Sequence, residues 1–527
     1  MPLADEIGRR RTFAIISHPD AGKTTLTEKF LLYGGAINLA GSVKGRKTAR
    51  HAVSDWMEIE KERGISVTSS VLQFQYNGLC VNILDTPGHQ DFSEDTYRTL
   101  MAADSAVMVI DASKGVEAQT IKLFKVCVMR HIPIFTFINK LDREAKDPFE
   151  LLDDIERVLG IATCPVNWPM GSGKSFKGIY ERDKKQITTF KAEGSGQREI
   201  ATEILDPASP EAREKLGNPA MDQLEEDLEM LDAVAEMDEE AVAAGLLSPV
   251  FFGSALTNFG VQIFLEHFLA MSPAPGPRPS SKGIVDPVTE PFSAFVFKIQ
   301  ANMNKAHRDR IAFMRIASGR YEAGMEVNHV QGGRKIRLSQ STQMMAQERT
   351  LVEEAYAGDI IGVFDPGVFS IGDTLCLSEE KFTYEGIPTF APEHFARLRQ
   401  IDTMKRKQFI KGVEQIAQEG AIQIFQEMRG GMEEIIVGVV GVLQFDVLMF
   451  RLKNEYNVEA GLDVLPYEYI RWIESDTDPE TIQGTSDMKR VCDLKGRPLL
   501  LFINSWSPRM VLDRNPGLVL SEFGNNT

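Results

Sequence analysis

Four short polar segments, each directly after an apolar run of strand length, constrain this chain more than any other feature. The apolar runs are residues 12–16, 81–84, 135–138 and 249–252. The segments that follow them are Ser17-His18-Pro19-Asp20-Ala21-Gly22-Lys23-Thr24, Asp85-Thr86-Pro87-Gly88-His89, Asn139-Lys140-Leu141-Asp142 and Ser254-Ala255-Leu256. Loops after parallel strands meet at one edge of a sheet, where nucleotides bind. The order therefore predicts an α/β domain of the P-loop NTPase class with a mostly parallel sheet.

The first segment has the composition of a phosphate-binding loop. Residues 24–33 are expected to form the next helix, so the loop amides and the helix N-terminus face an anion together. Lys23 is expected to reach the β- and γ-phosphates, the Thr24 hydroxyl to ligate Mg²⁺, and Gly22 to permit close backbone approach. The strict pattern has glycine where Ser17 stands. The alternative, an ordinary Gly-Lys-Thr helix start, leaves the flanking strand and the partner segments unexplained.

The second segment supplies groups for a metal and for catalysis. Asp85 ends a predicted strand, where its carboxylate can hold Mg²⁺ through water. Gly88 offers a bare backbone N–H to the γ-phosphate. His89 is expected to orient the attacking water, the role that a glutamine has in other GTPases. The alternative for His89 is a histidine satisfied in the core or capping the next helix.

The third and fourth segments select the base. The Asp142 carboxylate can accept hydrogen bonds from N1–H and the 2-amino group of guanine, and adenine offers neither in that arrangement. Lys140 can lie along the purine face, and Asn139 can tie this loop to the phosphate loop. The tripeptide Ser254-Ala255-Leu256 can place a backbone N–H on guanine O6 and is informative only through its position. The four segments together predict binding of GTP and GDP with Mg²⁺.

Residues 55–68, between the first two segments, combine dense charge with a glycine. This composition suits a switch that orders when a γ-phosphate and Mg²⁺ are bound, with a hydroxyl as the metal ligand. Ser66 is the first choice for that ligand and Thr68 the alternative. Residues 55–62 also fit a solvated amphipathic helix.

These residues resemble those of the translational GTPase family, whose first switch reads Arg-Gly-Ile-Thr and whose second reads Asp-Thr-Pro-Gly-His. Here the first switch is Arg63-Gly64-Ile65-Ser66, which keeps a hydroxyl where most members carry threonine. Within the family the chain is most similar to the bacterial class II release factors. The similarity is carried by Ser17-His18-Pro19-Asp20-Ala21-Gly22-Lys23-Thr24-Thr25 and by residues 91–100, 295–303 and 441–447.

The resemblance implies a GTPase that the ribosome stimulates. Such a protein uses GTP binding and hydrolysis after peptide release to promote dissociation and recycling of the codon-reading release factors. Its partners are then the ribosome, both rRNA and ribosomal proteins, and those factors. A rival is an elongation factor G-like translocation or ribosome-protection GTPase, but about 50 residues after the third expected domain cannot supply its extra C-terminal domains. A non-ribosomal regulatory GTPase would need only the first domain.

Composition bounds the compartment and the partners. The five cysteines are scattered without disulfide or zinc spacing, which fits the cytoplasm: Cys80, Cys127, Cys164, Cys376 and Cys492. No apolar run approaches the roughly 18 residues of a membrane span. We expect a cytoplasmic monomer that binds neither DNA nor membrane. The net charge of −17 is opposite to the basic character expected of a protein that binds RNA. If the chain binds rRNA, its positive charge must therefore be concentrated in part of the surface.

The chain divides into a nucleotide-binding domain, a β-barrel and an α+β domain. We expect these at 1–275, 292–385 and 392–527, the last with a C-terminal tail, and a proline-rich linker at 276–291. An acidic insertion is expected at about 180–245. Within it, residues 221–240 carry ten Asp or Glu and no Lys or Arg. This segment is either a solvated helix face or a docking surface for a basic protein. Basic clusters at 307–310 and 405–411 are either rRNA contacts or solvated charge.

Overall fold

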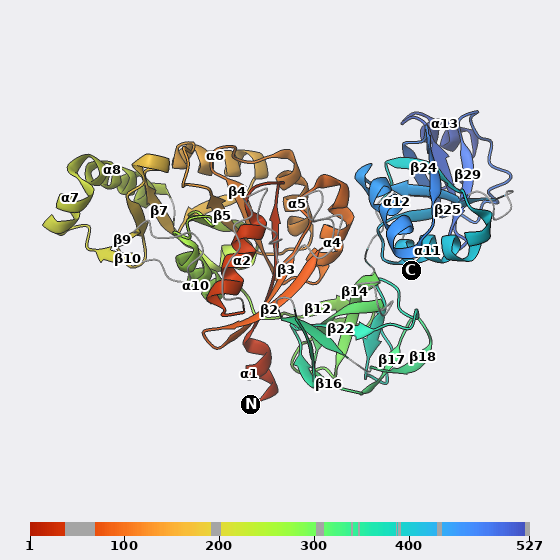
Figure 1. Ribbon diagram of the computed structural model, residues 1–527, viewed down its shortest axis with the longest axis horizontal. Coiled ribbons are helices and arrows are strands. Elements are labelled where there is room, and N and C mark those ends of the chain that lie inside the picture. Colours follow the sequence, from red (N-terminus) through yellow and green to blue (C-terminus); the bar gives the residue numbers. More distant parts are fainter. Residues whose placement is uncertain are drawn as a thin grey trace.

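The computed structural model of the protein describes residues 1–36, 69–190, 202–234, 236–301, 310–338, 341–345, 348–385, 387, 391–428 and 435–521. These residues form three domains along the long axis of the molecule (Figure 1). The first domain holds the elements between residues 3 and 271, the second those between 293 and 376, and the third those between 394 and 521. The predicted fold class, a P-loop type α/β domain followed by a barrel-like and an α+β domain, is confirmed.

The first domain is built on a seven-stranded sheet. In spatial order its strands are β2 (Ser70–Tyr76), β3 (Leu79–Asp85), β1 (Arg10–Ser17), β4 (Ser105–Asp111), β5 (Ile134–Asn139), β11 (Leu247–Phe252) and β6 (Ala162–Pro165). Neighbouring strands pair in parallel, except for the antiparallel pair β2 and β3. A sheet covered on both faces requires continuous apolar strands, and this is why the four runs were recognisable in the sequence.

Helices cover both faces of this sheet. They are α2 (Lys23–Tyr33), η1 (Gln90–Phe92), α4 (Ser93–Met101), α5 (Ala118–Met129), α6 (Pro148–Leu159) and α10 (Val261–Met271), whereas α1 (Leu3–Gly8) packs through Ile7 in the core of the second domain. Successive side chains of a strand point to opposite faces. Phe13 and Ile15 of β1 therefore pack with α2 and α10, whereas Ala14 and Ile16 pack with α4, α5 and α6. The two cores fix the edge where the loops meet.

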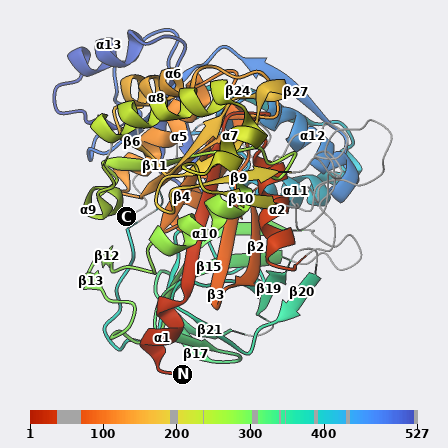
Figure 2. The same cartoon turned by 90° about the vertical axis from the view of Figure 1, so that its left-hand side faces the viewer.

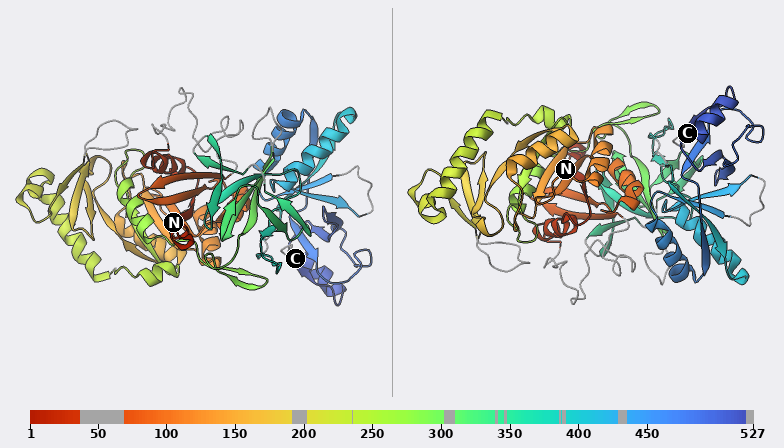
Figure 3. Two further views of the ribbon diagram at one scale, coloured as in Figure 1. Left: turned by 90° about the horizontal axis from the view of Figure 1, so that it is seen from below. Right: turned by 90° about the horizontal axis from the view of Figure 1, so that it is seen from above.

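A second sheet and further helices lie between β6 and β11 in the chain. They are β7 (Asn167–Met170), η2 (Gly173–Ser175), β8 (Gly178–Glu181), β9 (Gln186–Phe190), β10 (Thr202–Leu205), α7 (Pro210–Leu216), α8 (Asn218–Val234) and α9 (Glu239–Ala243). The acidic helix predicted in this region is α8, and its Leu224 and Leu231 are buried. This sheet begins before position 180, because β7 and β8 belong to it. The insertion forms one end of the molecule, opposite the third domain (Figures 2 and 3).

The region predicted as a linker, residues 276–291, contains a hairpin. Its strands β12 (Arg278–Ser280) and β13 (Gly283–Val285) pair antiparallel. The turn depends on Gly283, whose φ of 109° is open mainly to glycine. Ser281 donates its backbone N–H to the Thr383 carbonyl at 2.8 Å, so the hairpin is fixed to a later segment. Strands of three residues are too short to show a periodic pattern, which is why the prolines dominated the prediction.

The second domain is barrel-like and consists of an eight-stranded and a two-stranded antiparallel sheet around its own core. Its strands are β14 (Ser293–Ala301), β15 (Arg310–Ser318), β16 (Arg320–Glu322), β17 (Glu326–His329), β18 (Arg334–Arg337), β19 (Thr342–Met345), β20 (Glu348–Leu351), β21 (Glu354–Tyr356), β22 (Ile360–Phe364) and β23 (Thr374–Cys376). The long pair β14 and β15 carries a register shift between Val296 and Lys298. Such bulges bend strands and help a sheet to curve.

The third domain places helices on an eight-stranded sheet. Its elements are β24 (His394–Gln400), η3 (Thr403–Lys405), α11 (Arg406–Gln418), β25 (Gln423–Glu427), β26 (Ile435–Val439), α12 (Leu443–Tyr456), β27 (Ala460–Leu465), β28 (Tyr469–Ile473), β29 (Lys489–Asp493), β30 (Pro498–Phe502), α13 (Ser507–Arg514) and β31 (Leu520–Ser521). Helices α11 and α12 pack over β24, β25 and β26. Residues 469–521, where the sequence suggested a tail, add four strands and a helix to this domain.

Polar contacts join the three domains. Arg315 of β15 is fully buried and contacts Asp104 of the first domain at 2.5 Å. Arg98 of α4 donates to the Gly420 carbonyl of the third domain at 3.2 Å. Arg310 of β15 donates to the Gln418 side chain at the end of α11. The first domain therefore contacts both of the others.

Two further expectations concern cysteines and membranes. All five cysteines are free thiols, and each except Cys492 is buried. Within the part of the chain that the structure describes, no helix combines the length and apolar character needed to cross a membrane.

Candidate guanine nucleotide site

The phosphate-loop segment connects the end of β1 to the start of α2. Asp20 and Gly22 both take left-handed backbone angles, with φ of 65° and 98°. Helix α2 has no side-chain cap at its N-terminus, so the amides of its first turn remain directed at the loop. A Cβ atom at Gly22 would lie 2.2 Å from Nδ2 of Asn139. Glycine is required here by both the backbone angle and the close approach of the neighbouring loop.

A buried ion pair lies below this loop. Nζ of Lys23 is 2.5 Å from Oδ1 of Asp85, and both residues are less than 10% exposed. The other carboxylate oxygen of Asp85, Oδ2, is buried and has no hydrogen-bond partner among the described residues. Thr86 donates its hydroxyl to the Ile15 carbonyl at 2.6 Å, which fixes the end of β3 beside β1. A buried carboxylate oxygen left open in this way fits a hydrated cation.

Asn139 joins three loops at the base-binding side. Its Nδ2 donates to the Ala21 carbonyl at 2.7 Å, and its Oδ1 accepts from the Ala255 backbone N–H at 2.9 Å. Ser254 donates its hydroxyl to Oδ1 of Asp142 at 2.6 Å. The first, third and fourth predicted segments therefore meet, although they are more than 100 residues apart in the sequence.

Lys140 is held by a carboxylate that the sequence analysis missed. The residue takes a left-handed conformation with φ of 75°, and its Nζ lies 2.7 Å from Oδ2 of Asp111. Asp111 ends β4 and pairs in register with Asn139 of β5. Burial raises the pKa of Asp111, but hydrogen bonds from Lys140 and Ser113 outweigh it and leave the pKa below its usual value. The one signal in the sequence was an aspartate directly after an apolar run.

The remaining predicted residues line the same edge. His18 is buried, and its Nε2 lies 2.7 Å from Glu117, a second partner that sequence reasoning missed. Burial lowers the pKa of His18, although Glu117 opposes the shift. Ser17 donates its hydroxyl to the His18 carbonyl at 2.9 Å, and Leu141 donates its N–H to Gly253 at 3.3 Å. The other members are Pro19, Thr24 and Thr25 at the phosphate loop, Pro87 after β3, and Leu256 after β11.

His89 lies on the side of this edge that faces the third domain. Its Nδ1 is 3.1 Å from Oδ1 of Asp91 and 3.3 Å from the Asp91 backbone N–H. The ring packs edge-on to Phe92 at 6.2 Å, and the side chain is 30% exposed. The preceding Gly88 lies against the phosphate loop, since a Cβ there would be 3.6 Å from Cα of Pro19. Of the two alternatives for His89, a histidine satisfied in the core does not fit this exposure, whereas the bond from the Asp91 N–H in η1 is a contact of the helix-capping kind.

The predicted first switch lies outside the described residues. Ser66, Thr68 and the possible helix at 55–62 all belong to it. Of the predicted metal ligands, Thr24 and Asp85 belong to the described residues. Thr24 is the second residue of α2, one residue from Lys23.

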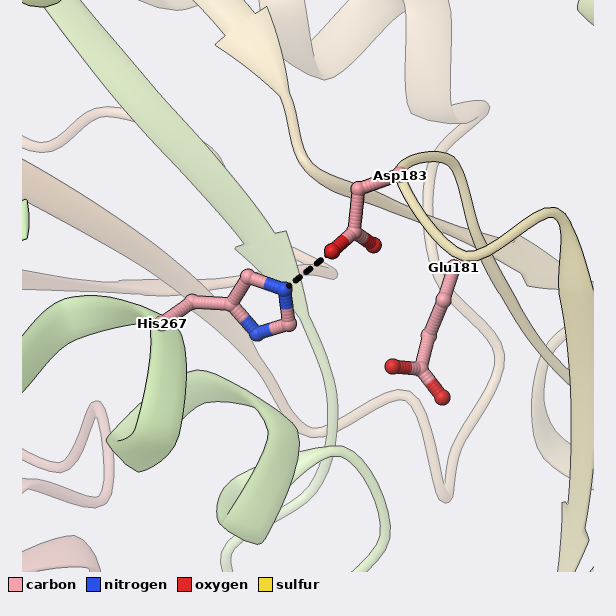
Figure 4. A group of neighbouring side chains, drawn as sticks. All are labelled: Glu181, Asp183 and His267. Carbon is pink, nitrogen blue, oxygen red and sulfur yellow. Dashed lines mark hydrogen bonds and ion pairs between the residues drawn. The ribbon is translucent and has the colours of Figure 1, made fainter. Parts of the chain in front are cut away.

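A separate cluster of carboxylates and a histidine lies between the insertion and α10 (Figure 4). Glu181, Asp183 and His267 place ligand-type atoms within 4.8 Å of one another. The Glu181 carboxylate already accepts from Lys184 at 2.7 Å and Thr188 at 2.9 Å. His267 bonds the Ile263 carbonyl through Nδ1 and Asp183 through Nε2, at 2.8 and 3.0 Å. These contacts form a satisfied ion-pair network that joins the insertion to the first domain.

Three family models match the chain one after another. The Elongation factor Tu GTP binding domain matches residues 8–274, and Elongation factor G domain 2 matches residues 291–378. The Class II release factor RF3 C-terminal domain matches residues 384–512. The third match is specific to one group of translation factors, whereas the first two are shared more widely.

Relatives match over nearly their whole length. Peptide chain release factor 3 of Symbiobacterium thermophilum is 62% identical, covering 98% of this chain and 98% of the relative. Peptide chain release factor 3 of Streptococcus mutans is 52% identical, covering 99% and 100%. A crystal structure of a Thermus thermophilus protein has a TM-score of 0.69 at 23% identity, covering 92% of this chain and 72% of that chain, and supports the fold alone. The chain belongs to the peptide chain release factor 3 family, and it is a GTP hydrolase of translation termination.

Proposed function

We propose that the protein binds GTP with Mg²⁺ where β1, β3, β5 and β11 end, and that the nucleotide cycle promotes dissociation and recycling of codon-reading release factors on the ribosome. The proposed nucleotide binding is supported by the contacts of Asn139, which join the phosphate loop to the loop after β11. The recycling half is supported by the family and by the near-complete coverage of relatives named peptide chain release factor 3.

Lys23 and the amides at the start of α2 bind the phosphates in this proposal. With nucleotide bound, Lys23 exchanges part of its contact with Asp85 for the β- and γ-phosphates. The Thr24 hydroxyl and the Asp85 carboxylate hold Mg²⁺, with Ser66 as a third ligand. The buried Oδ2 of Asp85, which has no hydrogen-bond partner in the described part of the chain, supports the metal assignment. When bound there, Mg²⁺ would supply neutralisation of the phosphate charge.

Asp142 and the loop after β11 recognise the base. One Asp142 oxygen accepts from Ser254, which leaves the carboxylate oriented and still able to accept from guanine. Lys140, held by Asp111, covers the purine face. The Ala255 amide is already bound to Asn139, so we assign contact with guanine O6 to a neighbouring backbone N–H of the 254–256 segment.

His89 orients the attacking water. It follows Gly88, which lies against the phosphate loop, and its Nε2 has no hydrogen-bond partner among the described residues. An imidazole with one nitrogen held and the other open can position a water molecule.

The remaining assignments concern partners and organisation. Ribosome contacts, a monomeric state and a cytoplasmic location stand as proposals, as do the domain limits 1–275, 292–385 and 392–527. The 276–291 segment connects the first two domains and is held by its hairpin.

The deciding experiment measures GTP turnover with and without ribosomal termination complexes, scored separately for release-factor recycling and for translocation. We expect termination complexes to stimulate turnover and recycling to depend on GTP. Stimulation of translocation alone would favour the elongation factor G-like alternative, and turnover indifferent to ribosomes would favour a regulatory GTPase.

A further inference from the structure

The carboxylate of Asp91 bridges the nucleotide edge and the third domain. Asp91 lies in η1, and its Oδ1 is 3.1 Å from Nδ1 of His89, which lies just before η1. Its Oδ2 accepts the backbone N–H of Leu443 at 2.8 Å. Leu443 is the first residue of α12, which belongs to the third domain. One buried side chain therefore contacts both His89 and a helix more than 350 residues later.

The third domain is shaped to receive this side chain. Leu443 N–H belongs to the first turn of a 14-residue helix, where amides lack partners within the helix and an anion is favoured. A Cβ atom at Gly441 would lie 2.2 Å from Cγ of Asp91, so any larger residue would push the carboxylate away. Gln444 accepts from the backbone N–H groups of Gly441 and Val440 at 3.0 and 2.9 Å, which holds the receiving turn.

Asp91 approaches Nδ1 of His89 with both its side chain and its backbone. A carboxylate oxygen accepts only, so its approach to Nδ1 favours Nδ1–H and leaves the lone pair on Nε2. The Asp91 backbone N–H, 3.3 Å from the same Nδ1, favours the opposite tautomer. The backbone N–H makes the hydrogen bond to Nδ1, and the carboxylate lies beside the same nitrogen at ion-pair distance. Together they hold Nδ1 against Asp91 and leave Nε2 directed away from it.

We propose that Asp91 is the positioning residue for His89, and that docking of α12 on Asp91 fixes the turn that keeps Nδ1 against Asp91 and leaves Nε2 open to water. This inference rests on the proposed role of His89 in orienting water. The third domain then contributes to hydrolysis without touching the nucleotide.

The test is a double-mutant cycle in the full-length protein, read by single-turnover GTP cleavage on ribosomal termination complexes. The variants are Asp91→Asn, His89→Ala and the two together. Asparagine keeps an oxygen for Leu443 and replaces the carboxylate at Nδ1 by an amide donor. We expect Asp91→Asn to slow cleavage at least ten-fold with GTP affinity within two-fold, and to have no further effect when His89 is alanine.

Gly441→Ala tests the same contact from the third domain. Its methyl group displaces Asp91, so cleavage should fall as in Asp91→Asn. The matched control is Gly461→Ala in β27, where a Cβ would be 3.7 Å from its nearest neighbour, and this variant should behave as wild type.

The outcomes separate the two proposals. If His89→Ala slows cleavage and Asp91→Asn stays within two-fold of wild type, the positioning role is wrong and the catalytic role of His89 stands. If Asp91→Asn slows the His89→Ala protein by a further ten-fold, Asp91 acts through the fold and the inference is overturned. If His89→Ala itself leaves cleavage unchanged, both proposals fail.

Discussion

Two regions of the molecule bury charged side chains, the nucleotide edge of the first domain and the junction, which is the cluster of Arg451, Glu419 and Glu455 where the third domain meets the others. The two regions differ in whether the buried charges have partners. At the nucleotide edge, Asp85 has one oxygen on Lys23 and the other without a partner among the described residues. At the junction, buried Arg451 donates to Glu419 at 2.9 and 3.1 Å and to Glu455 at 2.8 and 3.0 Å. One region keeps an open polar group for a ligand, and the other region satisfies its charges internally.

The comparison shows how buried polarity distinguishes a site from an interface. Leaving a buried carboxylate oxygen open costs free energy unless a ligand or water later satisfies it. A guanidinium that binds two carboxylates needs no such ligand and instead fixes geometry. Asp91 belongs to both regions, since it contacts His89 and the N-terminus of α12.

The largest effect is expected from breaking the junction. Arg451→Met removes the guanidinium that lies between the Glu419 and Glu455 carboxylates, and losing one partner of a buried pair costs about 3–5 kcal/mol. Urea unfolding followed by tryptophan fluorescence measures it, because Trp472 and Trp506 lie in the third domain. The control is Arg399→Met, which removes an exposed pair with Asp463 and should leave the midpoint unchanged. Equal midpoints for the two variants would contradict the account of the junction.

Asp142→Asn should change the preferred base at the nucleotide edge. The amide no longer suits N1–H of guanine but can face the extra carbonyl of xanthine. Losing the charge-assisted contact should cost about 2–4 kcal/mol in GTP binding. Equilibrium titration with GTP and with xanthosine triphosphate measures the change. Wild-type affinity for GTP in this variant would show that Asp142 does not read the base.

Gly22→Ala probes how closely the loops are packed. The new methyl group would meet Asn139 and the backbone would be strained, which together should weaken GTP binding by about 1–3 kcal/mol. Gly78→Ala is the matched control, because Gly78 also has a positive φ but no atom within 4 Å of the added Cβ. Titration with GTP should show wild-type affinity for Gly78→Ala and weaker binding for Gly22→Ala, and equal affinities would contradict the close packing of the loops.

The smallest effect is expected on the acidic face of α8. Glu226 and Glu229 are exposed, and replacing both by glutamine should leave GTP affinity and the unfolding midpoint within error. Leu231→Ala in the same helix should lower the midpoint, because Leu231 is 2% exposed and packs in the core. A loss of GTP binding on removing the two charges would connect the insertion to the nucleotide edge.

The elements around the site were predictable because each has a local signature. The helix predicted at 24–33 is α2, Lys23–Tyr33, and the strand predicted at 135–138 is β5, Ile134–Asn139. Both faces of the sheet are covered, so its strands are continuous apolar runs. Roles that depend on nucleotide, Mg²⁺ or water, such as those of Thr24 and His89, stay predictions.

Contacts between distant segments could not be predicted in the same way. Asp111 meets Lys140 only because β4 and β5 pair in one register, and a single aspartate after an apolar run is common. Asp91 meets Leu443 through domain packing that no periodicity encodes. The strand β30, Pro498–Phe502, is an apolar run whose partners β28 and β29 are short and partly exposed. No hydrophobic pattern in residues 469–521 therefore predicted that this segment extends the sheet of the third domain.

The central claim is that this edge binds GTP with one set of residues and cleaves it with another, and His89→Ala tests it most directly. Lys23, Asp85 and Asp142 remain in place, so GTP affinity should stay within two-fold. Losing the group that orients the water should slow single-turnover cleavage on termination complexes by roughly 10²-fold or more. Because product release cannot limit a single turnover, such a loss is assigned to the chemical step. Cleavage within about three-fold of wild type would contradict the claim and leave His89 with a structural role.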